Sequence, residues 1–195
     1  MKRTLLAGIL GGVAMFLWSS LAHDGLPLGR IGVSEIPNEQ TALAALHTSI
    51  GEQHGLYLFP GFGVKPGASR EQQKAAMQQY PQKLAANASG FLVYHPPGAT
   101  LSFGKLLTVE FLTELVQAIL VVLLLAQTRI ASFGGRVGFV TTAGVLAAIA
   151  TNIPYWNWYG FPSNYTVAYM SIEIIGFFVM GLVAAAVMRK GTTAT

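Results

Sequence analysis

The chain has 195 residues, of which 52% are hydrophobic and 10% are charged. A soluble domain carries about 25% charged residues, so this composition excludes an ordinary soluble domain and indicates that lipid surrounds much of the chain. Cysteine is absent, which excludes disulfides and cysteine-based metal sites, and the formal charge of +4 is not gathered into a basic stripe, so we expect no nucleic-acid partner.

Four stretches are apolar and long enough to cross a bilayer as helices, which takes about 20 residues each. They cover residues 4–22, 104–127, 137–153 and 166–188. This pattern predicts a membrane-embedded all-α bundle of four helices. The long segment between the first and the second helix, residues 23–102, predicts a small α+β extracytoplasmic domain inserted there.

The first apolar stretch has two interpretations. Its basic start, its apolar run and the Ser-Leu-Ala sequence at residues 20–22 also fit a cleavable signal peptide. Its length, Trp18, and the GxxxG spacing of Gly8 and Gly12 favour a retained helix, because small residues four apart let two helices approach closely in lipid. We favour the retained helix, with Gly8 and Gly12 as its packing face.

Residues 23–102 are too many for a simple loop, and their pattern predicts the order helix, strand, helix, strand. The first helix starts after Asn38, which can serve as its N-cap, and ends near Ile50. The second helix starts at Ser69, which has the spacing of a capping box with Gln72.

The two predicted strands are the glycine-bounded apolar segments at residues 55–61 and 90–98. Pro81 can break the helix between them. Because the connection is long enough for a helical crossover, we expect the strands to be parallel neighbours. Two short strands and two helices make a small core, so we expect this domain to lean on the membrane helices or on a partner.

All four histidines, His23, His47, His54 and His95, lie between residues 23 and 102. They lack the HxH and HxxxH spacings of metal sites, so we interpret them as exposed or hydrogen-bonded side chains and predict no metal and no cofactor. His23 stands where the first helix ends and could face the bundle.

Residues 154–165 form a predicted loop without Lys or Arg but with many aromatic side chains. Tyr155, Trp156, Trp158 and Tyr159 are typical of the membrane interface, where one part of a ring meets hydrocarbon and another part forms hydrogen bonds. We interpret them as interface anchors, with an aromatic ligand cage as the alternative.

Basic residues next to the apolar stretches indicate the orientation. Three pairs flank them: Lys2 and Arg3, Arg129 and Arg136, and Arg189 and Lys190. With four crossings all six lie on one side, which the positive-inside rule makes the cytoplasm. We therefore expect a multi-pass protein with both termini in the cytoplasm.

Three acidic residues fall inside predicted spans: Glu110, Glu114 and Glu173. A charged group at mid-bilayer costs at least about 2.5–3.5 kcal/mol, so these side chains should face the bundle interior. Glu110 and Glu114 share one helix face, and counting from the outer helix ends puts Glu173 at a depth between them. We expect the three carboxyls to meet, with Tyr169 as a hydrogen-bond donor to Glu173.

Burial and mutual repulsion disfavour three negative charges in one place. We therefore expect at least one of these carboxyls to be protonated at neutral pH, or a cation to be shared among them. Structural hydrogen bonding, a proton or ion site, and direct catalysis stay open as roles, in that order of preference. The chain has no common nucleophile, metalloprotease or nucleotide-binding motif, so no catalytic residue is predicted.

Three segments carry a resemblance: Ile36-Pro-Asn-Glu39, Gly55-Leu-Tyr-Leu-Phe-Pro-Gly61 and Trp156-Asn-Trp-Tyr-Gly-Phe-Pro162. Together they resemble a group of small four-helix inner-membrane proteins of bacteria to which no activity is assigned. The resemblance implies a bacterial inner membrane, and hence a periplasmic position for residues 23–102. It implies no catalytic or binding residue.

The function that the sequence favours is that of a non-catalytic accessory, assembly or interaction component. Its partners would be the lipid bilayer and either another membrane protein or a second copy of the chain. The alternative is a small proton- or ion-coupled transporter that uses the intramembrane carboxylates. A membrane enzyme acting at the outer leaflet is the second alternative.

Overall fold

The computed structural model describes residues 1–188, and the basic pair Arg189 and Lys190 lies outside the described residues. The chain divides into two compact units. The first, called the helical unit, combines Met1–Ser34 with Leu101–Thr195, and the second, called the small unit, is Glu35–Thr100.

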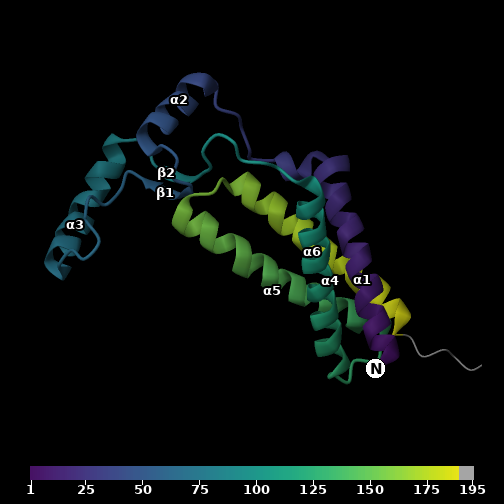
Figure 1. Cartoon of the computed structure of the whole chain (residues 1–195). Coiled ribbons are helices and arrows are strands. Elements are labelled where there is room, and N and C mark those ends of the chain that lie inside the picture. Colours follow the sequence, from purple (N-terminus) through teal and green to yellow (C-terminus); the bar gives the residue numbers. More distant parts are fainter. Residues whose placement is uncertain (189–195) are drawn as a thin grey trace, which may run out of the picture. The chain divides into compact units, whose positions relative to one another are not determined.

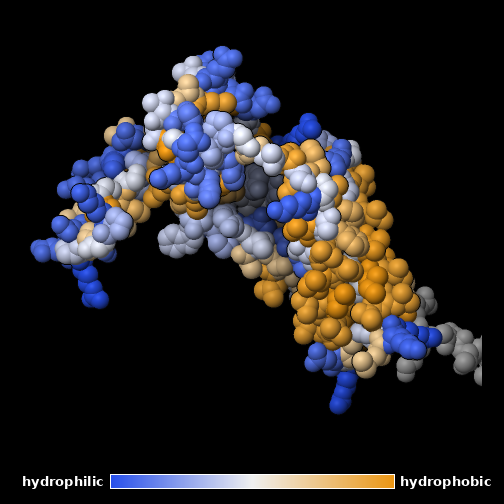
Figure 2. Space-filling model, viewed as in Figure 1, coloured by the Kyte–Doolittle hydropathy of each residue, from blue (hydrophilic) through white to orange (hydrophobic). Residues whose placement is uncertain are grey.

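Four long helices make up the helical unit: α1 (Lys2–Ser20), α4 (Phe103–Ala126), α5 (Phe133–Tyr159) and α6 (Ser163–Val187). Within residues 1–188, these four, with α1 extended by a π-helical turn at Leu21–Gly25, are long and apolar enough to cross a membrane. Figure 2 shows hydrophobic residues over the visible flank of this unit, where a soluble bundle would carry charges. The predicted set of four membrane-length helices is confirmed, which indicates a multi-pass membrane protein.

The third apolar stretch is the shortest of the four, which leaves open that its helix extends into the aromatic segment after it, and the structure shows that extension. The helix does not end at residue 153 before an aromatic loop, because α5 continues to Tyr159 and α6 begins at Ser163. Pro154 lies inside α5, where it cannot donate a backbone hydrogen bond to Ala150 but its fixed φ still suits a helix. Gly160 then ends the helix in a left-handed conformation, with φ 69°. The predicted loop at 154–165 is therefore wrong, since most of its residues are helical.

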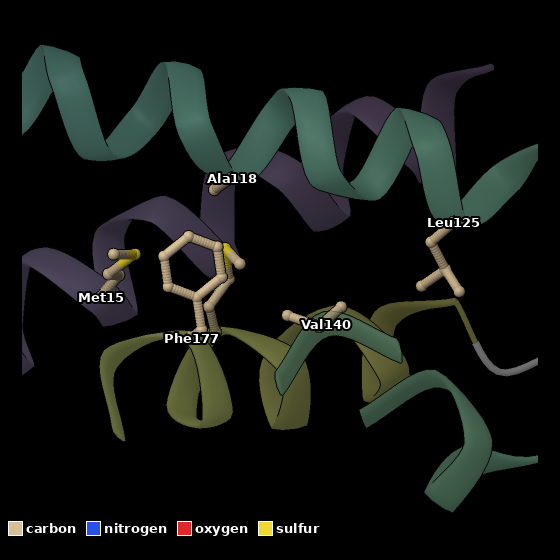
Figure 3. Packing of buried hydrophobic residues seen from close by; sticks show 6 residues of the cluster. Met15, Ala118, Leu125, Val140 and Phe177 are labelled. Carbon is tan, nitrogen blue, oxygen red and sulfur yellow. The ribbon is translucent and has the colours of Figure 1, made fainter. Parts of the chain in front are cut away.

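The central helix of this unit is α1, which packs against both α4 and α6, while α6 packs in turn against α5 (Figure 1). One buried cluster draws on all four helices: Met15, Ala118, Leu125, Val140, Phe177 and Met180. In Figure 3 the ring of Phe177 on α6 lies between Met15 of α1 and Ala118 of α4. The hydrophobic core therefore sits where these three helices meet.

Glycines let α1 approach its neighbours closely. A Cβ added at Gly12 would lie 2.8 Å from Leu115 Cα, and one added at Gly8 would lie 2.9 Å from Ile119 Cα, both on α4. Gly11, on the adjacent face, packs against α6. Close backbone contact of this kind is what holds helices together in lipid, because lipid tails are as apolar as the side chains.

The small unit contains α2 (Glu39–Ile50), β1 (Gly55–Phe59), α3 (Arg70–Ala86) and β2 (Gly90–Tyr94), in the order that the sequence predicts. In this fully described unit the two strands form one sheet, in which Gly55 lies opposite Tyr94. The strands are antiparallel, so the predicted parallel pairing is wrong. A connection that contains a helix permits a parallel crossover without requiring it, and the antiparallel pair is slightly more stable per residue.

The sequence predicts three local features of the two helices in the small unit, and the structure does not confirm all of them. Ser69 and Gln72 form the predicted capping box of α3, with the backbone N–H of Gln72 donating to Ser69 Oγ at 3.2 Å. Pro81 does not break α3, which continues to Ala86. Asn38 occupies the N-cap position of α2 but makes no side-chain capping bond.

Candidate functional site

Glu114 is a buried acid of the helical unit, with only 3% of its surface exposed. It lies on α4 beside α1, where the hydroxyl of Ser19 donates a hydrogen bond of 2.5 Å to its Oε1. Its second oxygen, Oε2, is buried without a hydrogen-bond partner among the described residues. A carboxyl in this setting can hold a proton, because protonation removes the charge that hydrocarbon disfavours.

The neighbours of Glu114 include two other titratable groups. Glu110, one turn earlier on α4, is exposed. His23 follows the end of α1, and its Nδ1 lies 2.9 Å from the carbonyl oxygen of Ser19, whose hydroxyl is bonded to Glu114. Of the two acids on α4, only Glu114 is enclosed by a neighbouring helix.

Glu173 belongs to a different pair of helices. It lies on α6 and faces α5, where its Oε2 accepts hydrogen bonds from Thr151 Oγ1 at 3.0 Å and from Asn152 Nδ2 at 3.2 Å. Across residues 1–188 the one ion pair joins His47 to Glu52 in the small unit. No described basic side chain therefore neutralises Glu173.

The three predicted carboxyls are not gathered in one place. The described part of the chain contains no group of three or more His, Cys, Asp or Glu side chains that could hold a metal ion. Helix α1 packs against both α4 and α6. Glu114 on α4 is bonded to Ser19 of α1, whereas Glu173 on α6 is bonded to α5 on its other side. Equal depth along two helices does not bring side chains together when each helix presents its acid to a different neighbour.

Tyr169 joins the segment after α1 to α6, and its hydroxyl is not directed at Glu173 as expected. The hydroxyl donates to the carbonyl oxygen of Gly29 at 3.4 Å. Its ring packs edge-on against His23, with centroids 5.8 Å apart, and stacks on Tyr165, with centroids 4.2 Å apart. These contacts fasten residues 23–29 to the first turns of α6.

A cavity of about 280 Å³ lies between the ends of α5 and α6 that the short loop joins. It is lined by Thr151, Asn152, Tyr155, Phe161, Tyr165 and Thr166. The ring centroids of Tyr155 and Phe161 are 5.4 Å apart, as are those of Phe161 and Tyr165, and the ring planes are inclined at 56° and 59°. The three rings therefore adjoin one another in the lining, and Thr151 and Asn152, the partners of Glu173, are polar residues of the same lining.

The four aromatic residues predicted as interface anchors occupy different settings. Tyr155 lines the cavity, and Tyr159 lies beside it with ring centroids 5.5 Å apart. Trp156 Nε1 donates to Ser163 Oγ at 3.0 Å, which ties the end of α5 to the start of α6. Trp158 is 78% exposed, as an anchor in the headgroup region would be.

Three of the histidines lie in the small unit. Nε2 of His47 is 3.0 Å from Glu52 Oε1. His54 and His95 adjoin the strand pair at Gly55 and Tyr94, and both line a cavity of about 630 Å³. Glu52 lines the same cavity, but no three His, Cys, Asp or Glu side chains of this described unit are grouped closely enough to hold a metal ion.

Two polar contacts of α1 are not anticipated by the sequence analysis. One is the bond from Ser19 to Glu114, and the other runs from Trp18 Nε1 to the carbonyl oxygen of Ile172 on α6, at 2.8 Å. Gly176, one turn after Ile172, leaves room for the indole, since a Cβ added there would lie 3.3 Å from Trp18 Cδ1. These contacts could have been anticipated from a serine and a tryptophan, both hydrogen-bond donors, at the end of an otherwise apolar stretch.

The arrangement offers one enclosed carboxyl, one carboxyl beside an aromatic cavity, and a small unit with a thin core. The chain matches no known family model, no curated protein and no solved structure.

Proposed function

We propose that the chain is a non-catalytic accessory or assembly component of a membrane, and that the small unit binds its protein partner. The proposal rests on the small hydrophobic core of that unit. Among residues 35–100, all of them described, Tyr94 is the one buried side chain. A two-stranded sheet is marginal by itself, and a domain of this size buries little apolar surface, so a partner would supply the missing burial.

One face of the sheet is available for that partner. Leu56 lies opposite Val93 in the ladder, and Leu58 shares their face because side chains alternate along a strand. Leu56 and Val93 are 66% and 68% exposed, whereas Tyr94, which points to the opposite face, is buried. Covering this Leu56–Val93 face would contribute about 1.5–3 kcal/mol for each side chain that becomes fully buried.

Charge favours a protein over an anionic lipid surface as the occupant of this face. The small unit contains equal numbers of acidic and basic residues: Glu35, Glu39, Glu52 and Glu71, against Lys65, Arg70, Lys74 and Lys83. Anionic lipid attracts polybasic segments by about 1 kcal/mol for each basic residue near its surface, and a balanced unit gains no such attraction.

The proposal includes a bacterial inner membrane, with both termini in the cytoplasm and the small unit in the periplasm. The orientation is supported by Lys2, Arg3, Arg129 and Arg136, which lie next to the apolar helices and would fall on one side if all four helices cross the membrane. Reporter fusions test it: a fluorescent protein after Thr195 should fold in the cytoplasm, and alkaline phosphatase inserted near Gly67 should be active. The reverse pattern would contradict the orientation.

Copurification in mild detergent after crosslinking tests the interaction itself. The double variant Leu56→Ser with Val93→Ser should lose most of the crosslinked partner, while Leu43→Ser, an exposed apolar position on α2, serves as the matched control and should keep it. Mass spectrometry distinguishes a second copy from a different protein. A wild-type chain without any partner, or a double variant that retains its partner, would refute the proposal.

A second candidate function, a small proton- or ion-coupled transporter, is favoured by Glu114. Its enclosed carboxyl has one oxygen bonded to Ser19 and the other without a partner in the described chain. In vesicles with an imposed pH gradient, Glu114→Gln should abolish any proton flux of the wild type, because it keeps the shape and removes the titration. Glu110→Gln, at an exposed position, is the control, and equal fluxes for wild type and Glu114→Gln would exclude this role.

A further inference from the structure

We propose that the cavity between the ends of α5 and α6 binds an alkylammonium cation, held by the rings of Tyr155, Phe161 and Tyr165 and attracted by the carboxylate of Glu173 behind Thr151 and Asn152. This site lies within the helical unit, so it is independent of the partner-binding role of the small unit.

The three aromatic rings supply the recognition of an organic cation. The face of an aromatic ring carries partial negative charge and attracts a cation that lies within about 6 Å of its centroid. Neighbouring centroids in this lining are 5.4 Å apart, so a cation in front of Phe161 is within reach of more than one ring. The planes are inclined by 56° and 59°, so the rings do not stack flat on one another, and all three belong to the lining of one cavity.

Glu173 supplies the opposite charge. Its Oε2 accepts hydrogen bonds from Thr151 and Asn152, and both of these residues line the cavity. The carboxylate therefore lies one hydrogen bond behind the lining of the cavity, and it forms no ion pair with any side chain of residues 1–188. A carboxylate in a setting of low dielectric is costly without a counter-ion, so a bound cation would relieve that cost.

Contacts within the protein hold the walls of the cavity in place before any ligand binds. Tyr165 stacks on Tyr169, whose hydroxyl is bonded to Gly29. The bond from Trp156 to Ser163 fastens the two helix ends across the loop. A site formed in advance loses less conformational freedom on binding than one that has to be ordered by its ligand.

The size and the lining of the cavity select the class of cation. Its volume of about 280 Å³ is just below the range of ligand sites, about 300 to 1,000 Å³, so it suits a headgroup-sized molecule. A metal ion needs several oxygen or nitrogen ligands, and the described residues contain no group of three acidic, histidine or cysteine side chains. An alkylated ammonium is weakly hydrated and matches the aromatic lining. It can belong to a free solute or to a lipid headgroup.

Binding of choline to the purified full-length chain tests the proposal, in a maltoside detergent that carries no ammonium group. Isothermal titration calorimetry gives the affinity, and the fluorescence of Trp156 beside the cavity gives a second signal. The comparison ligand is 3,3-dimethylbutan-1-ol, which has the shape of choline with carbon in place of the charged nitrogen. We expect it to bind at least about tenfold more weakly than choline. Equal binding of the two, or no choline binding at millimolar concentration, overturns the proposal.

Variants locate the bound cation. Glu173→Gln should weaken choline about tenfold, and Tyr165→Leu should weaken it several-fold, whereas Tyr165→Phe keeps the ring and should bind as the wild type does. Trp158→Leu, an exposed aromatic position outside the cavity, is the matched control and should change nothing. Melting temperatures separate a lost site from a lost fold. Unchanged binding by Glu173→Gln, or equal weakening by both Tyr165 variants, overturns the proposal.

Two lipid environments distinguish the sources of the ammonium group. If a phosphatidylcholine headgroup occupies the cavity, free choline should bind in nanodiscs of phosphatidylglycerol and be excluded from nanodiscs of phosphatidylcholine. If the ligand is a free solute, choline should bind equally in both. Either result keeps the ammonium site, and the absence of binding from both kinds of nanodisc would overturn it.

Discussion

Replacing Gly12 by alanine should destabilise the helical unit by about 1–3 kcal/mol, the usual cost of forcing an extra carbon into a packed contact. The added Cβ would lie 2.8 Å from Leu115 Cα and 3.2 Å from Leu115 Cδ1, whereas ordinary contact begins at 3.4 Å. Since the nearer atom belongs to the backbone, a new rotamer cannot relieve the clash. The two helices would have to separate by about 0.6 Å, enough to forfeit a quarter or more of each dispersion contact along the seam.

The matched control is Gly138→Ala on α5, where an added Cβ meets nothing within 4 Å. Both substitutions gain about 0.5–1 kcal/mol of helix propensity, so their difference isolates the steric cost at the α1–α4 contact. The free energy of unfolding is measured by circular dichroism in mixed micelles of dodecyl sulfate and maltoside. A Gly12→Ala variant as stable as Gly138→Ala would refute the close backbone approach as the basis of this helix pair.

Three further substitutions test single contacts. Trp18→Phe should lower the unfolding free energy by about 1 kcal/mol, because the hydrogen bond to Ile172 is lost while the ring remains; an unchanged value in the same micelles would argue against that bond. Ser69→Ala should destabilise α3 by about 0.5–2 kcal/mol and speed amide exchange at its first turn, including Gln72, and unaltered exchange would speak against the capping box. Gly160→Ala should cost about 1–2 kcal/mol, because alanine is strained in the left-handed conformation that ends α5, and a melting temperature equal to that of the wild type would rule this out.

Patterns that act over one or two helical turns are predictable from this sequence. The four apolar helices follow from hydropathy alone, since lipid demands about 20 consecutive apolar residues. The capping box of α3 follows from the spacing of Ser69 and Gln72, which fixes two backbone N–H groups regardless of the rest of the fold. These features depend on neighbours in sequence, and so no knowledge of tertiary contacts is needed.

The direction of the strands could not be deduced in the same way. The strand segments Gly55–Phe59 and Gly90–Tyr94 are apolar on both faces, so no alternation of polar and apolar residues marks a register. A helical connection is compatible with either direction. Similarly, Pro154 and the aromatic residues after it are typical of a loop. A proline can nevertheless lie inside a membrane helix, because it removes one backbone hydrogen bond and neighbouring groups can satisfy the carbonyl that is left unpaired.

The two acids of the candidate sites were predictable, but the residues that surround them were not. The cost of burying charge identifies Glu114 and Glu173 as informative, because acids in apolar spans need partners. Which partners they find depends on the order in which the helices pack. The position of α1 against both α4 and α6 gives Glu114 a hydroxyl from Ser19 and leaves Glu173 to α5. Nothing in the spacing of the acids encodes that arrangement.

The position of α1 also bears on biosynthesis. α1 leaves the ribosome before its neighbour α4, and at about 5–20 residues per second α4 follows only after several seconds. During that interval the Gly8–Gly12 face lacks the helix against which it packs, and α4 and α6 later join a helix that is already in place. A peptidase that cut after Ala22 would release this helix, strip Glu114 of its hydroxyl partner and separate α4 from α6.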